Sequence, residues 1–162
     1  MTNAPMGHGV NQRDLIKMTP DEVEAFLDAE RTLQVASING DGTPHLVAMW
    51  FARHGGEIAF WTYGKSQKVV NLRRDPRLTV MVETGAKYEE LKGVTIYGTA
   101  RIIEDLDEVF EFGDKVYERY WGPIDSDPVR EGVRAMGRKR VLIVVERDKT
   151  VSWDHAKLGG GY

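Results

Sequence analysis

Short alternating segments separated by tight-turn signals are the feature that most limits how this chain can fold. Residues 33–38, 44–51 and 57–62 each have the composition of a β-strand, and they follow one another closely. The first break is Asn39-Gly40-Asp41-Gly42, whose residues accept the positive φ of a hairpin turn. The second break is His54-Gly55-Gly56. Three successive strands joined in this way predict an antiparallel meander.

The remaining segments complete a mainly β fold with helices (α+β). Further strands are predicted over residues 78–83, 93–103 and 141–146, with a polar loop over 84–92, which gives six strands. Gly98 inside the long strand indicates a bulge or a close backbone approach. Helices are predicted from Thr19-Pro20-Asp21-Glu22, a capping box with proline at the first position, to about residue 30 and over 107–120 and 127–136. The strand spacing fits a small closed or partly closed antiparallel barrel.

The two ends of the chain differ in character from the predicted domain over residues 18–150. Residues 1–17 have no periodicity and are expected to be a flexible arm, although an arm can also wrap a partner subunit. Residues 151–162 have little strand character and are expected to be a tail. Its aromatic and basic residues favour docking, for example on a neighbouring subunit, whereas its three glycines favour disorder. These aromatic and basic residues are Trp153, His155, Lys157 and Tyr162.

Composition excludes several classes of protein. The 162 residues, 41% hydrophobic and 29% charged, suit one ordinary soluble domain with a sizeable core. No stretch is apolar enough to span a membrane and no secretory signal is seen, so we expect a cytoplasmic protein. The absence of cysteine excludes disulfides and thiolate metal sites. A net charge of −3 argues against nucleic acid as the main partner.

The stretch from residue 61 to 77, W-T-Y-G-K-S-Q-K-V-V-N-L-R-R-D-P-R, is where a ligand site is predicted. A strand leads through Gly64 into a short helix that Ser66 opens and Asp75-Pro76 closes. The Ser66 hydroxyl is expected to accept a hydrogen bond from a free N–H of the first turn. Lys68 projects from that turn, so an ammonium meets the positive end of the helix dipole, which is a ready phosphate site. The alternative is a capped surface helix with a solvated lysine.

Two other stretches are candidates for the same site. A flat heteroaromatic ring could lie along residues 46–50 and take its polar contacts from the backbone, although Val47 and Met49 also suit a core. Trp50 and Trp61 could share one face, as packing or as a shelf for a cofactor. Lys87-Tyr88 could edge a pocket or could be ordinary loop residues.

Other chemistries have little support in the sequence. There is no Walker A motif, no G-x-G-x-x-G after a strand and no G-x-S-x-G elbow. The basic runs Arg73-Arg74 and Arg138-Lys139-Arg140 are interpreted as solvated faces. The histidines show no spacing typical of metal ligands, so no metal is expected. They are His8, His45, His54 and His155.

Four motifs together give the chain a resemblance to a known family. They are S-I-N-G-D-G-T-P-H from Ser37, V-A-M-W-F, K-S-Q-K-V-V-N-L-R-R-D-P-R, and G-V-T-I-Y-G-T-A-R-I-I from Gly93. In this order the chain resembles the flavin-type split-barrel proteins of the pyridoxamine 5′-phosphate oxidase superfamily over residues 19–148. The resemblance implies a six-stranded split barrel that forms a two-fold homodimer with two equivalent cofactor sites at the subunit interface.

The resemblance also implies which residues bind the cofactor. The cofactor phosphate would bind Lys68. Ser66, Gln67 and Lys65 lie beside Lys68 in the sequence, and Thr62 would also be near the phosphate. The ring lies along the second strand. Residues of the other subunit close the site, and Lys87, Tyr88 and the tail are the candidates. The strand residues are Val47, Ala48, Met49 and Trp50.

Departures from the oxidase pattern favour a different cofactor. The arginine- and histidine-bearing substrate site of the oxidase branch is missing, and G-x-S-Q-K resembles the branch that uses the deazaflavin coenzyme F-420. We therefore expect an F-420-dependent reductase that passes hydride to an electron-poor C=C or related acceptor, with FMN as the alternative cofactor. The proton donor is unassigned between Tyr88, His155 and solvent. A non-catalytic flavin, deazaflavin or haem carrier, or an interaction module with an empty site, is the competing interpretation.

Overall fold

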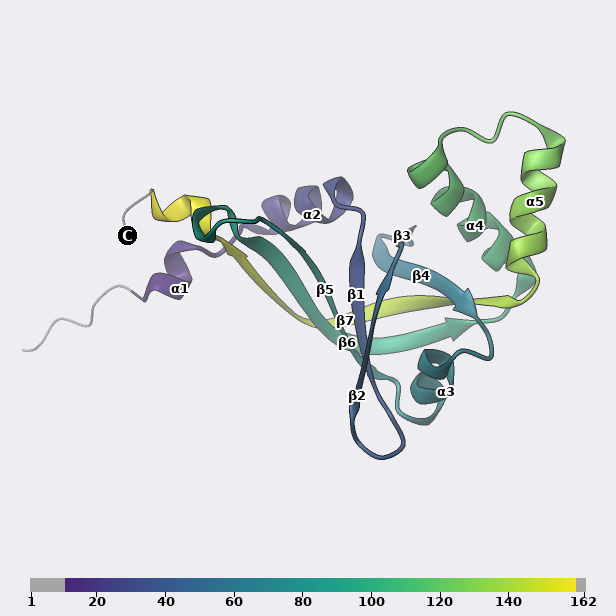
Figure 1. Cartoon of the computed structure of the whole chain (residues 1–162), viewed down its shortest axis with the longest axis horizontal. Helices are drawn as coiled ribbons and strands as arrows, with labels where there is room; N and C mark the ends of the chain where they lie inside the picture. Colours follow the sequence, from purple (N-terminus) through teal and green to yellow (C-terminus); the bar gives the residue numbers. More distant parts are fainter. Residues whose placement is uncertain (1–10, 160–162) are drawn as a thin grey trace, which may run out of the picture.

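One curled antiparallel sheet forms the centre of the molecule, and the computed structural model describes residues 11–159 (Figure 1). Its seven strands have the order β2-β1-β5-β6-β7-β4-β3. The strands are β1 (Leu33–Ile38), β2 (Pro44–Met49), β3 (Ala52–His54), β4 (Glu57–Tyr63), β5 (Arg77–Thr84), β6 (Lys92–Ile103) and β7 (Arg140–Asp154). The predicted mainly β, antiparallel architecture is confirmed, since all six neighbouring pairs are antiparallel.

The prediction of six strands is wrong because a further short strand, β3, follows the predicted strand 44–51, of which only β2 forms. Strand β2 pairs with β1, whereas β3 pairs with β4 at the other end of the sheet. Between them, Phe51 is buried, and its N–H donates to the Tyr120 hydroxyl at 3.0 Å. The same hydroxyl donates to the Arg31 carbonyl at 2.7 Å. The Tyr120 hydroxyl therefore binds the backbone N–H of Phe51, which a longer strand would use to pair with its neighbour.

Strand β7 is longer than predicted. The expected strand over 141–146 continues to Asp154, so the expectation of little strand character after residue 150 is wrong for 151–154. The polar residues 147–150 hide the pattern, but they pair with β6 beyond a register shift at Tyr97/Gly98. A side chain at Gly98 would collide with the Glu146 carbonyl, so the predicted bulge at Gly98 is confirmed.

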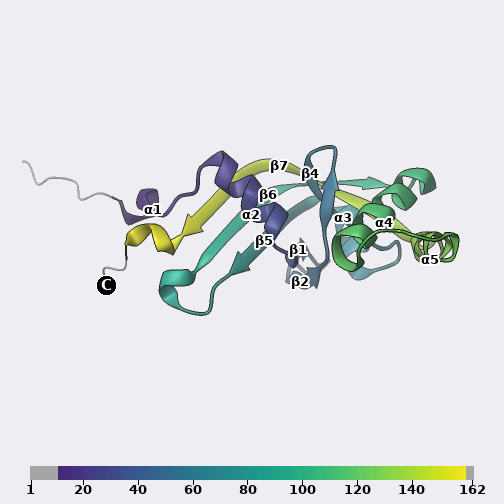
Figure 2. The same cartoon turned by 90° about the horizontal axis from the view of Figure 1, so that it is seen from above.

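Helices cover the sheet largely as predicted. The capping box at Thr19 and Glu22 is confirmed, with Glu22 N donating to Thr19 Oγ1 at 3.2 Å. Figure 2 shows α1 near one end of the molecule and α5 at the other. The helices are α1 (Gln12–Leu15), α2 (Pro20–Ala29), α3 (Gln67–Arg74), η1 (Tyr88–Glu90), α4 (Leu106–Trp121), α5 (Asp127–Gly137) and η2 (His155–Leu158).

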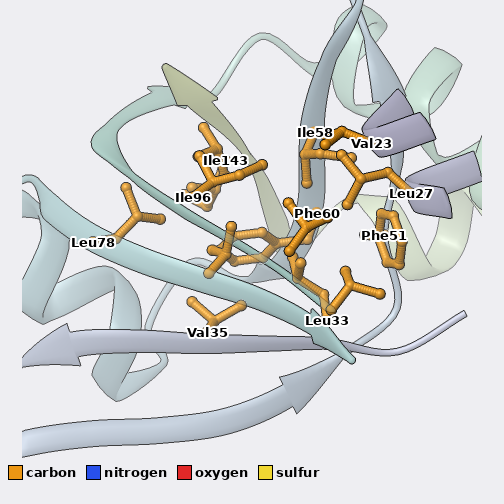
Figure 3. Packing of buried hydrophobic residues seen from close by; sticks show 14 of the residues in the cluster. Val23, Leu27, Leu33, Val35, Phe51, Ile58, Phe60, Leu78, Ile96 and Ile143 are labelled. Atoms are coloured by element: carbon orange, nitrogen blue, oxygen red, sulfur yellow. The ribbon is translucent and has the colours of Figure 1, made fainter. Parts of the chain in front are cut away.

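Two apolar clusters lie on opposite faces of β4 and β7. Ile58 and Phe60 point into the larger cluster with α2 (Figure 3), whereas Ala59 and Trp61 join the cluster under α4 and α5. Successive side chains of a strand face opposite sides, so both faces of these strands are buried. Burial of a side chain such as Phe60 stabilises the fold by about 1.5–3 kcal/mol.

The two ends of the described chain bind each other. Asp154 N donates to the Ile16 carbonyl at 2.7 Å, and Met18 N donates to Ser152 Oγ at 3.1 Å. Residues 1–10 of the predicted arm and 160–162 of the predicted tail lie outside the described residues. The described part of the arm holds the short helix α1. Through the two hydrogen bonds above, the segment that follows α1 binds the last residues of β7.

Candidate functional site

The segment after β4 turns sharply and enters α3. Gly64 N donates to the Lys139 carbonyl at 3.0 Å, which fixes the turn against the start of β7. The fully buried Asn71 then ties α3 to the first hairpin, because its Nδ2 donates to Ser37 Oγ at 3.1 Å and to Asn39 Oδ1 at 2.9 Å. The first turn of α3 is thus held at the end of β4.

Ser66 occupies the predicted N-cap position, but its predicted side-chain hydrogen bond is absent. The hydroxyl makes no bond to the first turn and lies 3.4 Å from Thr62 Oγ1. Within the described residues, the backbone N–H groups of Gln67 and Lys68 therefore make no hydrogen bond. These N–H groups and the helix dipole are available to an anion.

Lys68 lies where the sequence predicted a phosphate contact. Its Nζ donates to Thr62 Oγ1 at 3.0 Å, so Thr62, Ser66 and Lys68 come together. The side chain is half-buried and forms no ion pair with a carboxylate of residues 11–159. Burial lowers the Lys68 pKa below its ordinary value of 10.5, because a desolvated ammonium is disfavoured. An anion bound here would remove that penalty.

The other two predicted residues of this turn are exposed. Lys65 lies beside Ser66 with its side chain in solvent. Gln67 Nε2 donates to Asn71 Oδ1 at 2.9 Å, which gives Gln67 a structural bond on the helix. Contacts of either residue with a cofactor remain predictions.

Strand β2 is an edge strand with one face open. Leu46 is 67% exposed, and Ala48 and Trp50 are exposed on the same side. Val47 and Met49 face the other way and pack against the larger apolar cluster, which agrees with the core alternative for these two residues. Only the backbone and the exposed side of β2 are therefore open to a ring.

A pocket of about 450 Å³ connects β2 with the end of β4. Trp50 and Trp61 both line it, so the structure brings the two tryptophans to one site. Trp50 stacks on Tyr120 with ring centroids 4.3 Å apart. The lining residues are Thr32, Ala48, Met49, Trp50, Trp61 and Arg140.

Arg140 is a lining residue that the sequence interpretation missed. Its guanidinium carbon lies 4.6 Å from the Trp61 ring centre and 4.8 Å from that of Tyr63. The run Arg138-Lys139-Arg140 is thus not a uniformly solvated face: Arg138 pairs with Glu131, whereas Arg140 is half-buried. Pairing of Tyr63 with Arg140 across β4 and β7 creates this contact, and no local motif indicates it.

Lys87 and Tyr88 do not reach Lys68 within one chain. Strand β5, eight residues long, separates α3 from η1, which is a distance of about 25 Å. The Tyr88 ring instead contacts that of His155 with centroids 4.6 Å apart, and Lys157 binds the Lys17 carbonyl. Trp153 packs on Gly93. Tyr162 and His8 lie outside the described residues.

The described residues contain no group of three His, Asp or Glu side chains that could hold a metal. Over the same residues, none of the helices has the length and apolar character needed to cross a membrane.

Comparison with known proteins gives this geometry a context. The profile of the pyridoxamine 5′-phosphate oxidase family matches residues 19–152. The solved structure of a conserved hypothetical protein from Mycobacterium tuberculosis is 43% identical, with a TM-score of 0.87 and 94% of each chain covered. An F-420 reductase is 28% identical, with a TM-score of 0.64 over 82% of this chain and 98% of the other.

More distant structures share the fold alone. The haem storage protein HutZ from Vibrio cholerae is 17% identical, with a TM-score of 0.65 over 82% of this chain and 94% of the other. No protein with a curated description matches the chain. The family is therefore established by the profile match, and the chemistry has to be argued from the site.

Proposed function

We propose, from the premise that this chain belongs to the pyridoxamine 5′-phosphate oxidase family, that it is a reductase dependent on coenzyme F-420. The substrate would be an electron-poor small-molecule acceptor. The 28% identical F-420 reductase supports this choice of cofactor over FMN. The observation that carries the proposal is the half-buried Lys68, which has no carboxylate partner in the described chain, at the open first turn of α3.

The residues present fit a phosphate-bearing cofactor with a flat ring. Lys68, Thr62 and the N–H groups of the first turn of α3 would hold the phosphate. The backbone of β2 and its exposed side around Leu46 and Ala48 would support the ring, next to the Trp50 end of the strand. When bound, reduced F-420 supplies a hydride, so the chain itself needs to bind, orient and exclude water.

A homodimer is part of this proposal. The free edge of β2 and the distance between Lys68 and Tyr88 suit a site that a second copy completes. Lys87 and Tyr88 of the second copy would then close the cleft, with Tyr88, His155 or solvent as proton source. Light scattering should give the mass of a dimer at micromolar concentration. A monomer would remove the shared site.

A titration with F-420, run beside FMN, tests the cofactor. We expect saturable binding with a preference for F-420, and the Lys68→Ala variant should bind about 10- to 150-fold more weakly because a charge-assisted phosphate contact is lost. Lys115→Ala is a matched control, since Lys115 pairs with Glu111 on the surface of α4. Equal affinity of the wild type and Lys68→Ala would refute the site.

Turnover separates the enzyme from a carrier on the same fold. An enzyme oxidises reduced F-420 when an electron-poor acceptor is added, whereas a flavin, deazaflavin or haem carrier binds without turnover. The fold shared with the haem storage protein is the reason to keep this second candidate. Binding without oxidation by any acceptor in a broad screen would favour the carrier.

A further inference from the structure

The pocket between β2 and β4 contains a positive charge that the cofactor contacts proposed above do not use. Its volume of about 450 Å³ is in the range of small-molecule sites. It lies between the two ends of the curled sheet, where the chain passes from β2 to β3. Arg140 is the only charged residue among its lining residues.

Arg140 has no acceptor for its charge within residues 11–159. Its side chain forms no ion pair and no hydrogen bond there, and its buried Nε has no partner. By contrast, Arg53, Arg130 and Arg147 each pair with a carboxylate. A buried guanidinium donor without an acceptor is costly, so its retention beside a cavity points to a ligand that supplies the acceptor.

The aromatic rings around Arg140 orient it. Its guanidinium lies over the rings of Trp61 and Tyr63, and a guanidinium stacked in this way leaves its edge N–H groups for a carboxylate. A pre-oriented planar donor suits bidentate binding of a carboxylate. The fold therefore orders the long Arg140 side chain before any ligand binds.

Apart from Thr32, the other residues that line the pocket are apolar. Trp50 is held between the ring of Tyr120, stacked at 4.3 Å, and that of Trp121, edge-on at 4.7 Å. Ala48 and Met49 complete this side. Such a wall favours a planar apolar body, in contact with aromatic faces.

Arg140 is separate from the predicted phosphate contact. Thr62 and Tyr63 are neighbours on β4, so their side chains face opposite sides of the sheet. Lys68 binds Thr62 on one side, and Arg140 lies over Tyr63 and Trp61 on the other. Two cations on opposite faces can serve two different anionic groups.

We infer that this pocket binds the hydride acceptor and that Arg140 donates to its carboxylate, so the acceptor class is a planar conjugated carboxylate. The identification of the ligand as the acceptor rests on the proposed function. The anion site itself rests only on Arg140 and the pocket.

Isothermal titration of the purified protein with 2-naphthoate and its neutral analogue 2-naphthamide tests the anion site. We expect the wild type to bind the carboxylate at least about tenfold more tightly than the amide. Arg140→Met should remove this preference, and Arg140→Lys should keep part of it through its point charge. Arg138→Met is the matched control, because Arg138 pairs with Glu131 outside the pocket and the variant should bind as the wild type does.

Variants of the phosphate turn distinguish this inference from the proposed function. Lys68→Ala should keep the preference for 2-naphthoate, and saturating F-420 should leave the probe bound. Equal binding of the two probes by the wild type, or an unchanged preference in both Arg140 variants, would overturn the anion site. Displacement of the probe by F-420 would overturn its assignment to the acceptor. Failure of F-420 to bind would refute the cofactor proposal and leave the anion site standing.

Discussion

Replacing Gly113 by alanine tests how tightly Trp61 is held between α4 and the pocket. Gly113 is buried in the middle of α4, and a Cβ there would lie 2.6 Å and 2.8 Å from two carbons of the Trp61 ring. It would also lie 3.1 Å from a methyl group of Val133. Residue 113 is therefore a glycine because the Trp61 ring leaves no room for a side chain there.

The magnitude follows from two opposing effects. Alanine stabilises a helix interior by about 1 kcal/mol relative to glycine. Against this, the Trp61 ring has to retreat by about 0.8 Å, from 2.6 Å to the 3.4 Å of ordinary contact, and overpacking of this kind costs about 1–3 kcal/mol or more. Because Arg140 lies over the same ring and opposes its retreat, we expect a cost near the upper end of this range, about 3 kcal/mol, which leaves a net destabilisation of about 2 kcal/mol after the helix gain.

Urea unfolding followed by circular dichroism measures this balance. Gly132→Ala is the control, since Gly132 is exposed in α5 and, apart from its chain neighbours and the nearby backbone of the helix, no atom lies within 4 Å of the place that an alanine methyl would take. It should gain about 0.5–1 kcal/mol from helix propensity alone. The displaced Trp61 should also weaken 2-naphthoate binding in Gly113→Ala. A Gly113→Ala protein as stable as Gly132→Ala would refute the packing argument.

Two further predictions concern pH. Burial lowers the pKa of Lys68, whereas a bound phosphate favours the protonated form of this lysine. The affinity for the cofactor should therefore fall as the pH rises through the lowered pKa. A constant affinity up to pH 10.5 would contradict this. Hydrogen bonding from Arg147 lowers the pKa of Glu24 below its usual 4.5, so Glu24 adds stability above pH 4.5 that is lost as pH falls through the lowered value. The stability difference between the wild type and Glu24→Gln should therefore shrink below pH 4.5 in acid unfolding, and a pH-independent difference would exclude this linkage.

The parts of the fold that could be predicted are those that local sequence determines. The capping box at Thr19 and the bulge at Gly98 depend on residue types that favour one backbone geometry. The contact of Lys68 with Thr62 spans six residues and follows from a strand, a turn and a helix in succession. Such features need no knowledge of distant segments.

The missed features depend on distant partners. The division of β2 from β3 is fixed by the Tyr120 hydroxyl, 69 residues from Phe51. Arg140 enters the site because β7 pairs with β4, which no pattern near Arg140 reveals. The Ser66 cap failed for a different reason: its hydroxyl lies within 3.4 Å of Thr62 Oγ1 and makes no hydrogen bond to the first turn of the helix. Residue type alone predicted the position of the cap but not its bond.

The position of Tyr88 links the oligomeric state to the chemistry. Within one chain, β5 keeps η1 about 25 Å from the first turn of α3, and His155 stays with Tyr88. In a monomer neither residue could donate a proton at the pocket, and solvent would have to do so. In a dimer that closes the cleft, Tyr88→Phe should lower the turnover rate while the affinity for F-420 changes little. An unchanged rate in a proven dimer would assign the proton to solvent and leave η1 a structural role.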